Sequence, residues 1–368
     1  MRTPGAVLCR IAPSFLRFGS FELPARRGEV AVVRCLADYC LRHLRPYLMS
    51  LDQEVDSSVR TSPSLGKQEK RAASLENDAL NSPQAVESGE SAIGSDQLKH
   101  SYMKGNIEGR KEPREEYMEL LVSFVQVTAR MVAEWQALGF CHGVLNTDNF
   151  TLLGLGLDFG HCSFMEDYVP SWSPNEGDSA LRYTFQNQPD VAAWNCERLA
   201  EAFSSLVGQS GIAEANDAFL PAFDAAYTFR MQRKLGLEGM DLGNDWAAAL
   251  RSGSAERHQG THATLSWDAV FLLDLLRLMA NCRTDFTDTW RALIDVPGSS
   301  EALKSRNSSE LDSDSVGAGE SHEDMEVWDD ECLQPLAAVL ARAKPSQKQR
   351  QQWAQWIRQY MARIDSQA

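Results

Sequence analysis

Two long polar segments limit how much of this 368-residue chain can form a packed core. Residues 51–113 and 298–330 are rich in Ser, Gly and charged residues and hold few aromatic side chains. Such segments bury too little apolar surface to offset the entropy lost on ordering. The sequence therefore predicts two disordered insertions that separate three folded blocks, residues 1–50, 114–297 and 331–368.

The hydrophobic pattern within these blocks is mainly helical. Apolar residues between 114 and 139 recur at alternating steps of three and four, which places them on one face of a helix that Gly139 would end. Glycine-interrupted apolar residues indicate a short strand at 5–11 and a strand or hairpin at 150–157. Further helices are predicted over residues 30–48, 189–206, 212–236, 265–282 and 347–364.

Composition excludes several classes of function. The net charge is -15 with a pI of about 5.0, and without a basic stripe we expect no nucleic-acid partner. No apolar run approaches the roughly 18 residues of a membrane-spanning helix, so we expect no membrane partner. The eight cysteines are scattered without a C-x-x-C pair, which favours reduced thiols in an intracellular protein.

The segment with the clearest chemistry runs from His142 to Gly160. A loop after the long helix carries Asp148 and Asn149, a predicted hairpin follows, and Asp158 then precedes Phe159 and Gly160. Protein-kinase-like active sites have the same order of loop, hairpin and Asp-Phe-Gly turn. Magnesium needs only one or two protein oxygens, which Asn149 and Asp158 can supply. Asp148 is then free to accept a proton from an attacking hydroxyl group.

The combination is more specific than its parts. Asp-Phe-Gly alone is a weak signal, and by itself an ordinary turn would be the better interpretation. In ordinary protein kinases the motif H-R-D-x-x-x-x-N separates the catalytic Asp from the metal-binding Asn. Here Asn149 directly follows Asp148. This spacing points away from ordinary protein kinases.

Three runs resemble the selenoprotein O family. The run GVLNTDNFTLLGLGLDFG is similar to that family's G-V-M-N-T-D-N-M-S-[IL]-L-G-L-T-[IL]-D-Y-G. Residues 182–200 resemble R-Y-x-F-x-x-Q-P-x-x-x-x-W-N-x-x-R-L-A, and residues 5–19 resemble G-A-x-x-x-R-x-A-P-S-x-[IL]-R-F-G. The resemblance covers residues 5–50 and about 114–290, whereas the two polar segments match nothing.

The resemblance implies an α+β, protein-kinase-like fold, mostly its helical C-terminal lobe, in which a short β-hairpin leads to a DFG-type turn. It implies a protein adenylyltransferase that transfers AMP from ATP to Ser, Thr or Tyr hydroxyls of proteins. Asp148 would be the base, Asn149 and Asp158 would hold Mg²⁺ or Mn²⁺, and Asp158, Arg10 and Arg17 would contact the nucleotide. Without the resemblance, the two arginines would be interpreted as surface charge or part of a transit peptide.

The same comparison predicts what the chain lacks. No glycine-rich loop precedes Arg10 and no lysine precedes Lys67, so residues 1–50 are expected to be only the end of the N-terminal lobe and a connecting helix. The family's C-terminal tail is likewise expected to be missing, with residues 331–368 as a helical end segment. Two alternatives stay open: a protein kinase that activates the γ-phosphate, and an inactive binding module. The resemblance suggests mitochondria as the location, with the cytoplasm as the alternative.

Overall fold

The computed structural model describes residues 9–51, 113–243, 266–297 and 331–367, and every structural statement below concerns these residues. The strand predicted at 5–11 lies partly outside them, and its described part, residues 9–11, is not a strand. The predicted insertion at 298–330 lies wholly outside the described residues, and the one at 51–113 lies outside them except for residues 51 and 113. Residues 51 and 113 differ from the prediction, because each belongs to a helix.

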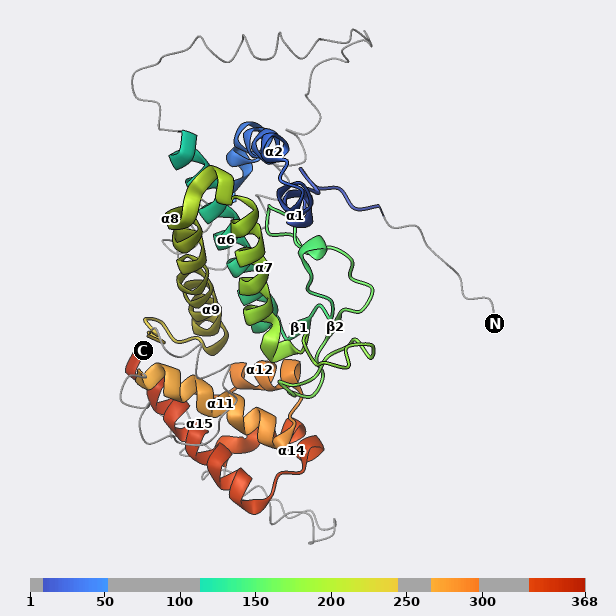
Figure 1. Ribbon diagram of the computed structural model, residues 1–368. Helices are drawn as coiled ribbons and strands as arrows, with labels where there is room; N and C mark the ends of the chain where they lie inside the picture. The colour runs from blue at the N-terminus through green and yellow to red at the C-terminus, as the bar shows by residue number, and fades with distance from the viewer. Residues whose placement is uncertain (1–8, 52–112, 244–265, 298–330, 368) are drawn as a thin grey trace, which may run out of the picture.

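A four-helix bundle forms the centre of the structure (Figure 1). The long helix α6 (Pro113–Leu138) is contacted by α7 (Gln188–Ala202), α8 (Ser204–Asp217) and α9 (Phe219–Leu235). Most of its apolar face is buried as the three-and-four spacing predicts, although Leu138 at its end is 52% exposed. Gly139 ends the helix with a φ of 71°. The single helix predicted over 212–236 is divided near Ala218 into the end of α8 and all of α9.

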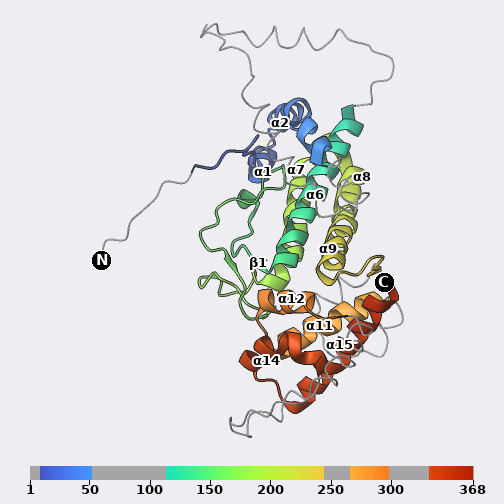
Figure 2. The ribbon, with the colours of Figure 1, turned by 180° about the vertical axis from the view of Figure 1, so that it is seen from behind.

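Two N-terminal helices cover one end of the bundle, as both ribbon views show (Figures 1 and 2). Helix α1 (Gly19–Arg26) contacts α7, and its Phe21 ring stacks on Phe203 with centroids 4.7 Å apart. Helix α2 (Val30–His43) ends earlier than predicted, because the chain turns at Leu44 before a further helical stretch over residues 45–51. These contacts attach the N-terminal segment to the same core as the bundle.

A second group of helices packs at the opposite end of the bundle (Figure 1). Here α15 (Gln347–Gln367) lies along α11 (Trp267–Cys282), beside α12 (Phe286–Ile294), the 3-10 helix η3 (Glu331–Leu336) and α14 (Ala337–Ala343). The Trp356 ring stacks on Phe271 at 4.6 Å, and the Tyr360 hydroxyl donates to the Leu235 carbonyl over 2.7 Å. The predicted helices at 265–282 and 347–364 are confirmed.

The β structure is small. Strand β1 (Phe140–Cys141) pairs antiparallel with β2 (Ser163–Phe164), so the fold is α+β and mostly helical. The predicted hairpin at 150–157 is an isolated antiparallel bridge between Phe150 and Gly156, without strands of its own. Gly154 turns it with a φ of 66°, where an added Cβ would lie 2.8 Å from the Val127 carbonyl oxygen.

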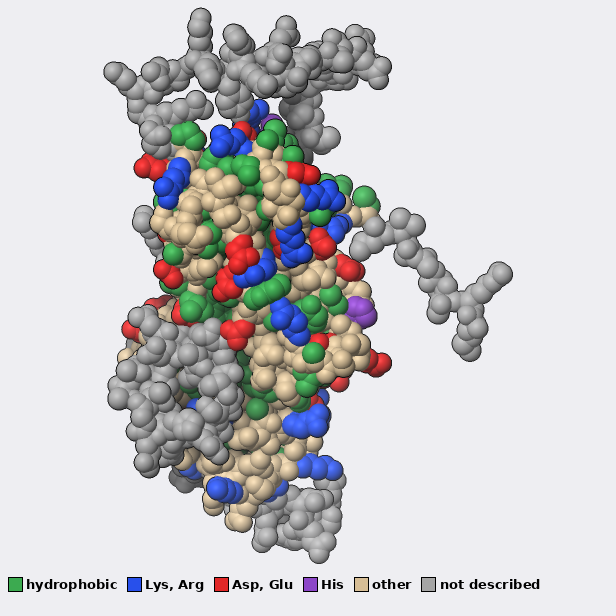
Figure 3. All heavy atoms as spheres, in the orientation of Figure 1, with side chains coloured by type: hydrophobic (Ala, Val, Ile, Leu, Met, Phe, Trp, Pro, Cys, Tyr) green, Lys and Arg blue, Asp and Glu red, His purple; other side chains and the backbone are tan. Residues whose placement is uncertain are grey.

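None of the described helices is long and apolar enough to cross a bilayer. On the face shown in Figure 3, acidic and basic side chains are interspersed among apolar ones.

Candidate functional site

The loop after β1 holds two of the predicted site residues. It ends in the 3-10 helix η1 (Thr147–Asn149), where the Asn146 side chain caps the turn by accepting from the Asp148 backbone N–H over 3.1 Å. The Asp148 carboxylate is exposed, whereas Asn149 is only 4% exposed and its Nδ2 donates to the Val144 carbonyl over 2.9 Å. One residue is therefore solvent-facing and its neighbour is rigidly held.

Asp158 lies next to this loop. The Leu157 backbone N–H donates to the Asn149 carbonyl over 2.9 Å, which joins the residue before Asp158 to the loop. Asp158 has a φ of 59°, in the left-handed region that aspartate tolerates better than most residues. Among the described residues, neither the Asp158 carboxylate nor the Asp148 carboxylate has a hydrogen-bond or ion-pair partner. The structure thus brings Asp148, Asn149 and Asp158 to one edge of the bundle.

His142 connects β1 to the same turn. Its Nε2 lies 2.7 Å from the Leu157 carbonyl oxygen, so Nε2 carries the hydrogen, and Nδ1 accepts from the Val144 N–H at 3.4 Å. The ring is fully buried between Trp135 and Phe159, with centroid distances of 5.6 Å and 5.2 Å. Burial lowers the pKa of His142, against the opposing effects of the Leu157 carbonyl and the Asp158 carboxylate. A neutral histidine therefore supports the backbone directly before Asp158.

The predicted arginines reach the same hairpin from the N-terminal segment. Arg10 donates from Nη1 to the Gly156 carbonyl, and its guanidinium carbon lies 5.2 Å from the centre of the Phe159 ring. Arg17 pairs through its backbone with Thr151, and its side chain is exposed. All five predicted site residues therefore lie on, or pair with, the loop and hairpin spanning residues 142–160.

Three buried or partly buried amides were not predicted to support the site. Gln188, at the start of α7, accepts from the His142 N–H and donates to the Phe140 carbonyl, both over 2.9 Å. Asn195 donates to the Leu145 carbonyl over 3.0 Å, and Asn175 donates to the Gly143 carbonyl over 3.0 Å. Gln188 and Asn195 fall within the family-like run at 182–200. That run was the sequence signal for them, but it gave no indication of what they contact.

The donor set suits a hard divalent cation. The bond from Asn149 Nδ2 to Val144 leaves Oδ1 as the amide atom without a protein partner in the described ranges. The Asp158 carboxylate is exposed beside it. Amide and carboxylate oxygens are the ligands that Mg²⁺ prefers, with water and phosphate oxygens completing its shell. No group of three His, Cys, Asp or Glu side chains with metal-binding geometry occurs within the described ranges.

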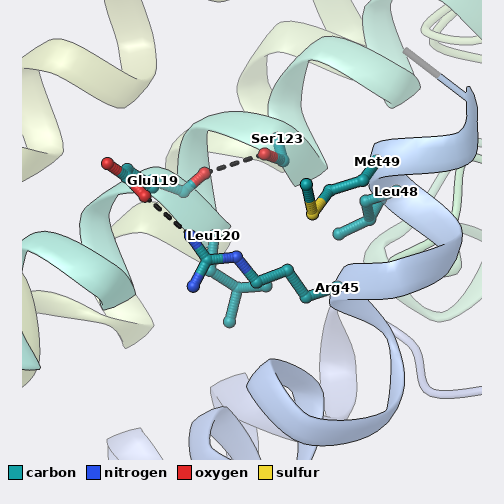
Figure 4. A pocket seen from close by; sticks show the side chains of 6 residues that line it. All are labelled: Arg45, Leu48, Met49, Glu119, Leu120 and Ser123. Atoms are coloured by element: carbon teal, nitrogen blue, oxygen red, sulfur yellow. Dashed lines mark hydrogen bonds and ion pairs between the residues drawn. The ribbon is translucent and has the colours of Figure 1, made fainter. Parts of the chain in front are cut away.

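A separate hollow lies between α6 and the helical stretch at 45–51 (Figure 4). Arg45 spans it and pairs with Glu119, whose carboxylate oxygen lies 2.9 Å from the guanidinium. Its lining contains none of the predicted site residues; it consists of Arg45, Leu48, Met49, Glu119, Leu120 and Ser123. Because an ion pair and apolar side chains line this hollow, we assign it a role in helix packing and no chemistry.

The fold and this edge define a mainly helical α+β protein with a phosphate- and metal-compatible loop site. The family model described as protein adenylyltransferase SelO matches residues 1–368, the whole chain. The chain therefore belongs to this family, and the resemblance found in the sequence is confirmed. Protein adenylyltransferases are nucleotidyltransferase enzymes, and their activity implies ATP and a protein as the two substrates.

Proposed function

We propose that this chain transfers AMP from ATP to Ser, Thr or Tyr hydroxyl groups of proteins through the site at Asp148, Asn149 and Asp158. The observation that carries the proposal is the 2.9 Å bond between Leu157 and Asn149, which joins the loop and the turn. It brings an exposed carboxylate, an amide oxygen and a second carboxylate to one edge. The kinase-like arrangement predicted from the sequence belongs to the same proposal.

Each residue has a distinct role in the proposed reaction. Asp148 accepts the proton of the target hydroxyl, whose oxygen forms a bond to the α-phosphorus of ATP while pyrophosphate leaves. Asn149 and Asp158 would hold Mg²⁺, which when bound neutralises phosphate charge. Arg17 is exposed and can bind phosphate oxygens directly. Arg10 can do so after giving up its contact with the Gly156 carbonyl.

The protein has two features that favour this assignment over a surface turn. Asp148 and Asp158 are exposed carboxylates without ion-pair partners among the described residues, in a chain that pairs many of its surface acids with arginine. His142 and Gln188 supply buried polar support to the backbone beneath them. Buried polar groups cost free energy unless they are satisfied, so a network of this kind is expected where backbone position matters. The mitochondrial location stays a prediction.

Two preparations of ATP, labelled at the α-phosphate or at the γ-phosphate, test the reaction. Transfer of AMP predicts label on protein only from the α-labelled nucleotide. Label only from the γ-phosphate would support the alternative of a protein kinase. The inactive binding module predicts a folded protein that binds no ATP at millimolar concentration.

The site assignment is tested by Asp158→Ala. Loss of a metal-binding carboxylate is expected to reduce AMP transfer by about a hundredfold or more. Asp217→Ala is a matched control, because Asp217 is exposed at the end of α8, distant in sequence from the loop and turn. Normal transfer by Asp158→Ala, with the control also active, would refute the assignment of Asp158.

A further inference from the structure

Gly19 has no conformational reason to be glycine. It is the first residue of α1 and has an ordinary negative φ, outside the left-handed region that favours glycine. Alanine at a helical position is more favourable than glycine by roughly 0.5–1 kcal/mol. Space is the remaining physical reason for a glycine here.

That space is occupied by the Asp148 side chain. A Cβ built on Gly19 would lie 2.2 Å from Asp148 Oδ1 and 3.2 Å from its Cγ, whereas ordinary contacts begin near 3.4 Å. Either the carboxylate must retreat by more than about 1 Å or the start of α1 must move. The two residues are separated by most of the N-terminal half of the chain, so the contact is a tertiary one.

The backbone around Gly19 is fixed more firmly than the carboxylate. Phe18 N–H donates to the Phe150 carbonyl over 3.1 Å, and Leu152 N–H donates to the Leu16 carbonyl over 3.0 Å. The rings of Phe18 and Phe150 are fully buried and stack with centroids 5.6 Å apart. In contrast, the Asp148 carboxylate is exposed and unbonded within the described ranges. A side chain at position 19 would therefore displace the carboxylate rather than the helix.

We propose that Gly19 is a positioning residue for the Asp148 carboxylate: its missing side chain leaves the place that the carboxylate occupies. The same paired segment carries Arg17, so it sets the position of a phosphate-binding candidate and of the base together. This inference rests on the proposed function for its catalytic meaning. The claim that Gly19 leaves space for the Asp148 carboxylate does not depend on the proposed function.

Gly19→Ala tests the proposal by separating activity from stability. A displacement of about 1 Å in a reacting group can reduce a rate by up to about a hundredfold, so we expect kcat to fall roughly 10-fold to 100-fold. The KM for ATP should stay close to that of the unaltered chain, and the unfolding temperature should be unchanged or higher. Leu23→Ala is the control, because it alters an exposed side chain of the same helix. It should leave kcat unchanged.

A crystal structure of Gly19→Ala decides the geometry whatever the activity. We expect the Asp148 carboxylate to be displaced by more than about 1 Å with α1 in place. Three outcomes would each overturn the proposal. These are an unchanged kcat, a loss of kcat that follows a loss of stability, and a displaced α1 with an unmoved carboxylate. If the unaltered chain transfers no AMP, the proposed function fails, and the carboxylate position alone decides the role of Gly19.

Discussion

Replacing Gln188 with leucine should destabilise the protein by several kcal/mol, because its side chain satisfies two buried backbone groups. The side chain is fully buried at the start of α7. It satisfies two backbone groups at once, the His142 N–H and the Phe140 carbonyl, each over 2.9 Å. Leucine has a similar volume but can satisfy neither group. The substitution therefore removes hydrogen bonds without opening a large cavity.

The magnitude follows from the two groups left without partners. Each buried backbone group that loses its hydrogen bond costs about 1–3 kcal/mol, so Gln188→Leu should lower the free energy of unfolding by about 2–6 kcal/mol. Urea denaturation followed by circular dichroism measures this difference. The control is Gln186→Leu, which makes the same chemical change at a half-buried residue whose side chain has no hydrogen bond within the described ranges. We expect the control to change stability by less than about 0.5 kcal/mol.

The comparison between the two variants can refute the reasoning. If Gln188→Leu unfolds at the same urea concentration as Gln186→Leu, the buried amide does not hold β1 and the loop. If only Gln188→Leu is destabilised, its remaining AMP transfer under stabilising conditions shows whether the loop also depends on this support. We expect activity to fall further than the folded fraction, because His142 and the loop residues follow directly after β1.

Two further predictions concern groups whose ionisation the fold perturbs. Burial lowers the pKa of His142 below 6.5, so the unfolded chain takes up a proton at a higher pH than the folded chain. The contribution of His142 to stability is therefore complete above pH 6.5 and is lost as the pH falls below it. His142→Phe should flatten the dependence of the unfolding temperature on pH between about 7 and 5.5. Equal slopes for the variant and the unaltered chain would contradict this. Burial lowers the pKa of Lys234 from 10.5 to about 8, although its ammonium faces the rings of Phe286 and Trp290. The rate of Lys234 acetylation, followed by mass spectrometry, should be half-maximal near pH 8 in the folded protein. In urea the pH of the half-maximal rate should shift toward 10.5. A half-maximal rate near pH 10.5 in the folded protein would contradict the lowered pKa.

Local sequence patterns were sufficient for the long helices α6, α11 and α15. The spacing of apolar residues between 114 and 139 predicts α6 within one residue at each end, because burial of one face repeats with the helical period. The helix predicted at 347–364 is α15, and its Trp353 and Trp356 are buried. Asp148, Asn149 and Asp158 were predicted as site residues because a loop, an expected hairpin and an Asp-Phe-Gly turn follow one another along the chain.

Patterns failed where elements were short. Strands β1 and β2 contain two residues each, too few for an alternation of apolar and polar side chains to be seen. The residues at 150–157 have the composition of a hairpin, yet only Phe150 and Gly156 form a bridge between them, around Gly154, while Thr151 pairs with Arg17. The break at Ala218 precedes Pro221, which lies in the first turn of α9, where a proline is tolerated, whereas the hydrophobic pattern over 212–236 continues across it. For the strands and the bridge, the backbone conformation depends on pairing that such short runs do not reveal.

Tertiary structure alone decided which residues support the site. Gln188 bonds to His142 and Asn195 bonds to Leu145 across long stretches of chain, and Gly19 meets Asp148 across a still longer one. A glutamine, an asparagine or a glycine looks the same in a sequence whether it faces solvent or a folded loop. The sequence by itself determined which groups could do chemistry, because that depends on side-chain type and local order. The structure decided what holds them in place, because hydrogen bonds and excluded volume depend on distances that only the folded chain defines.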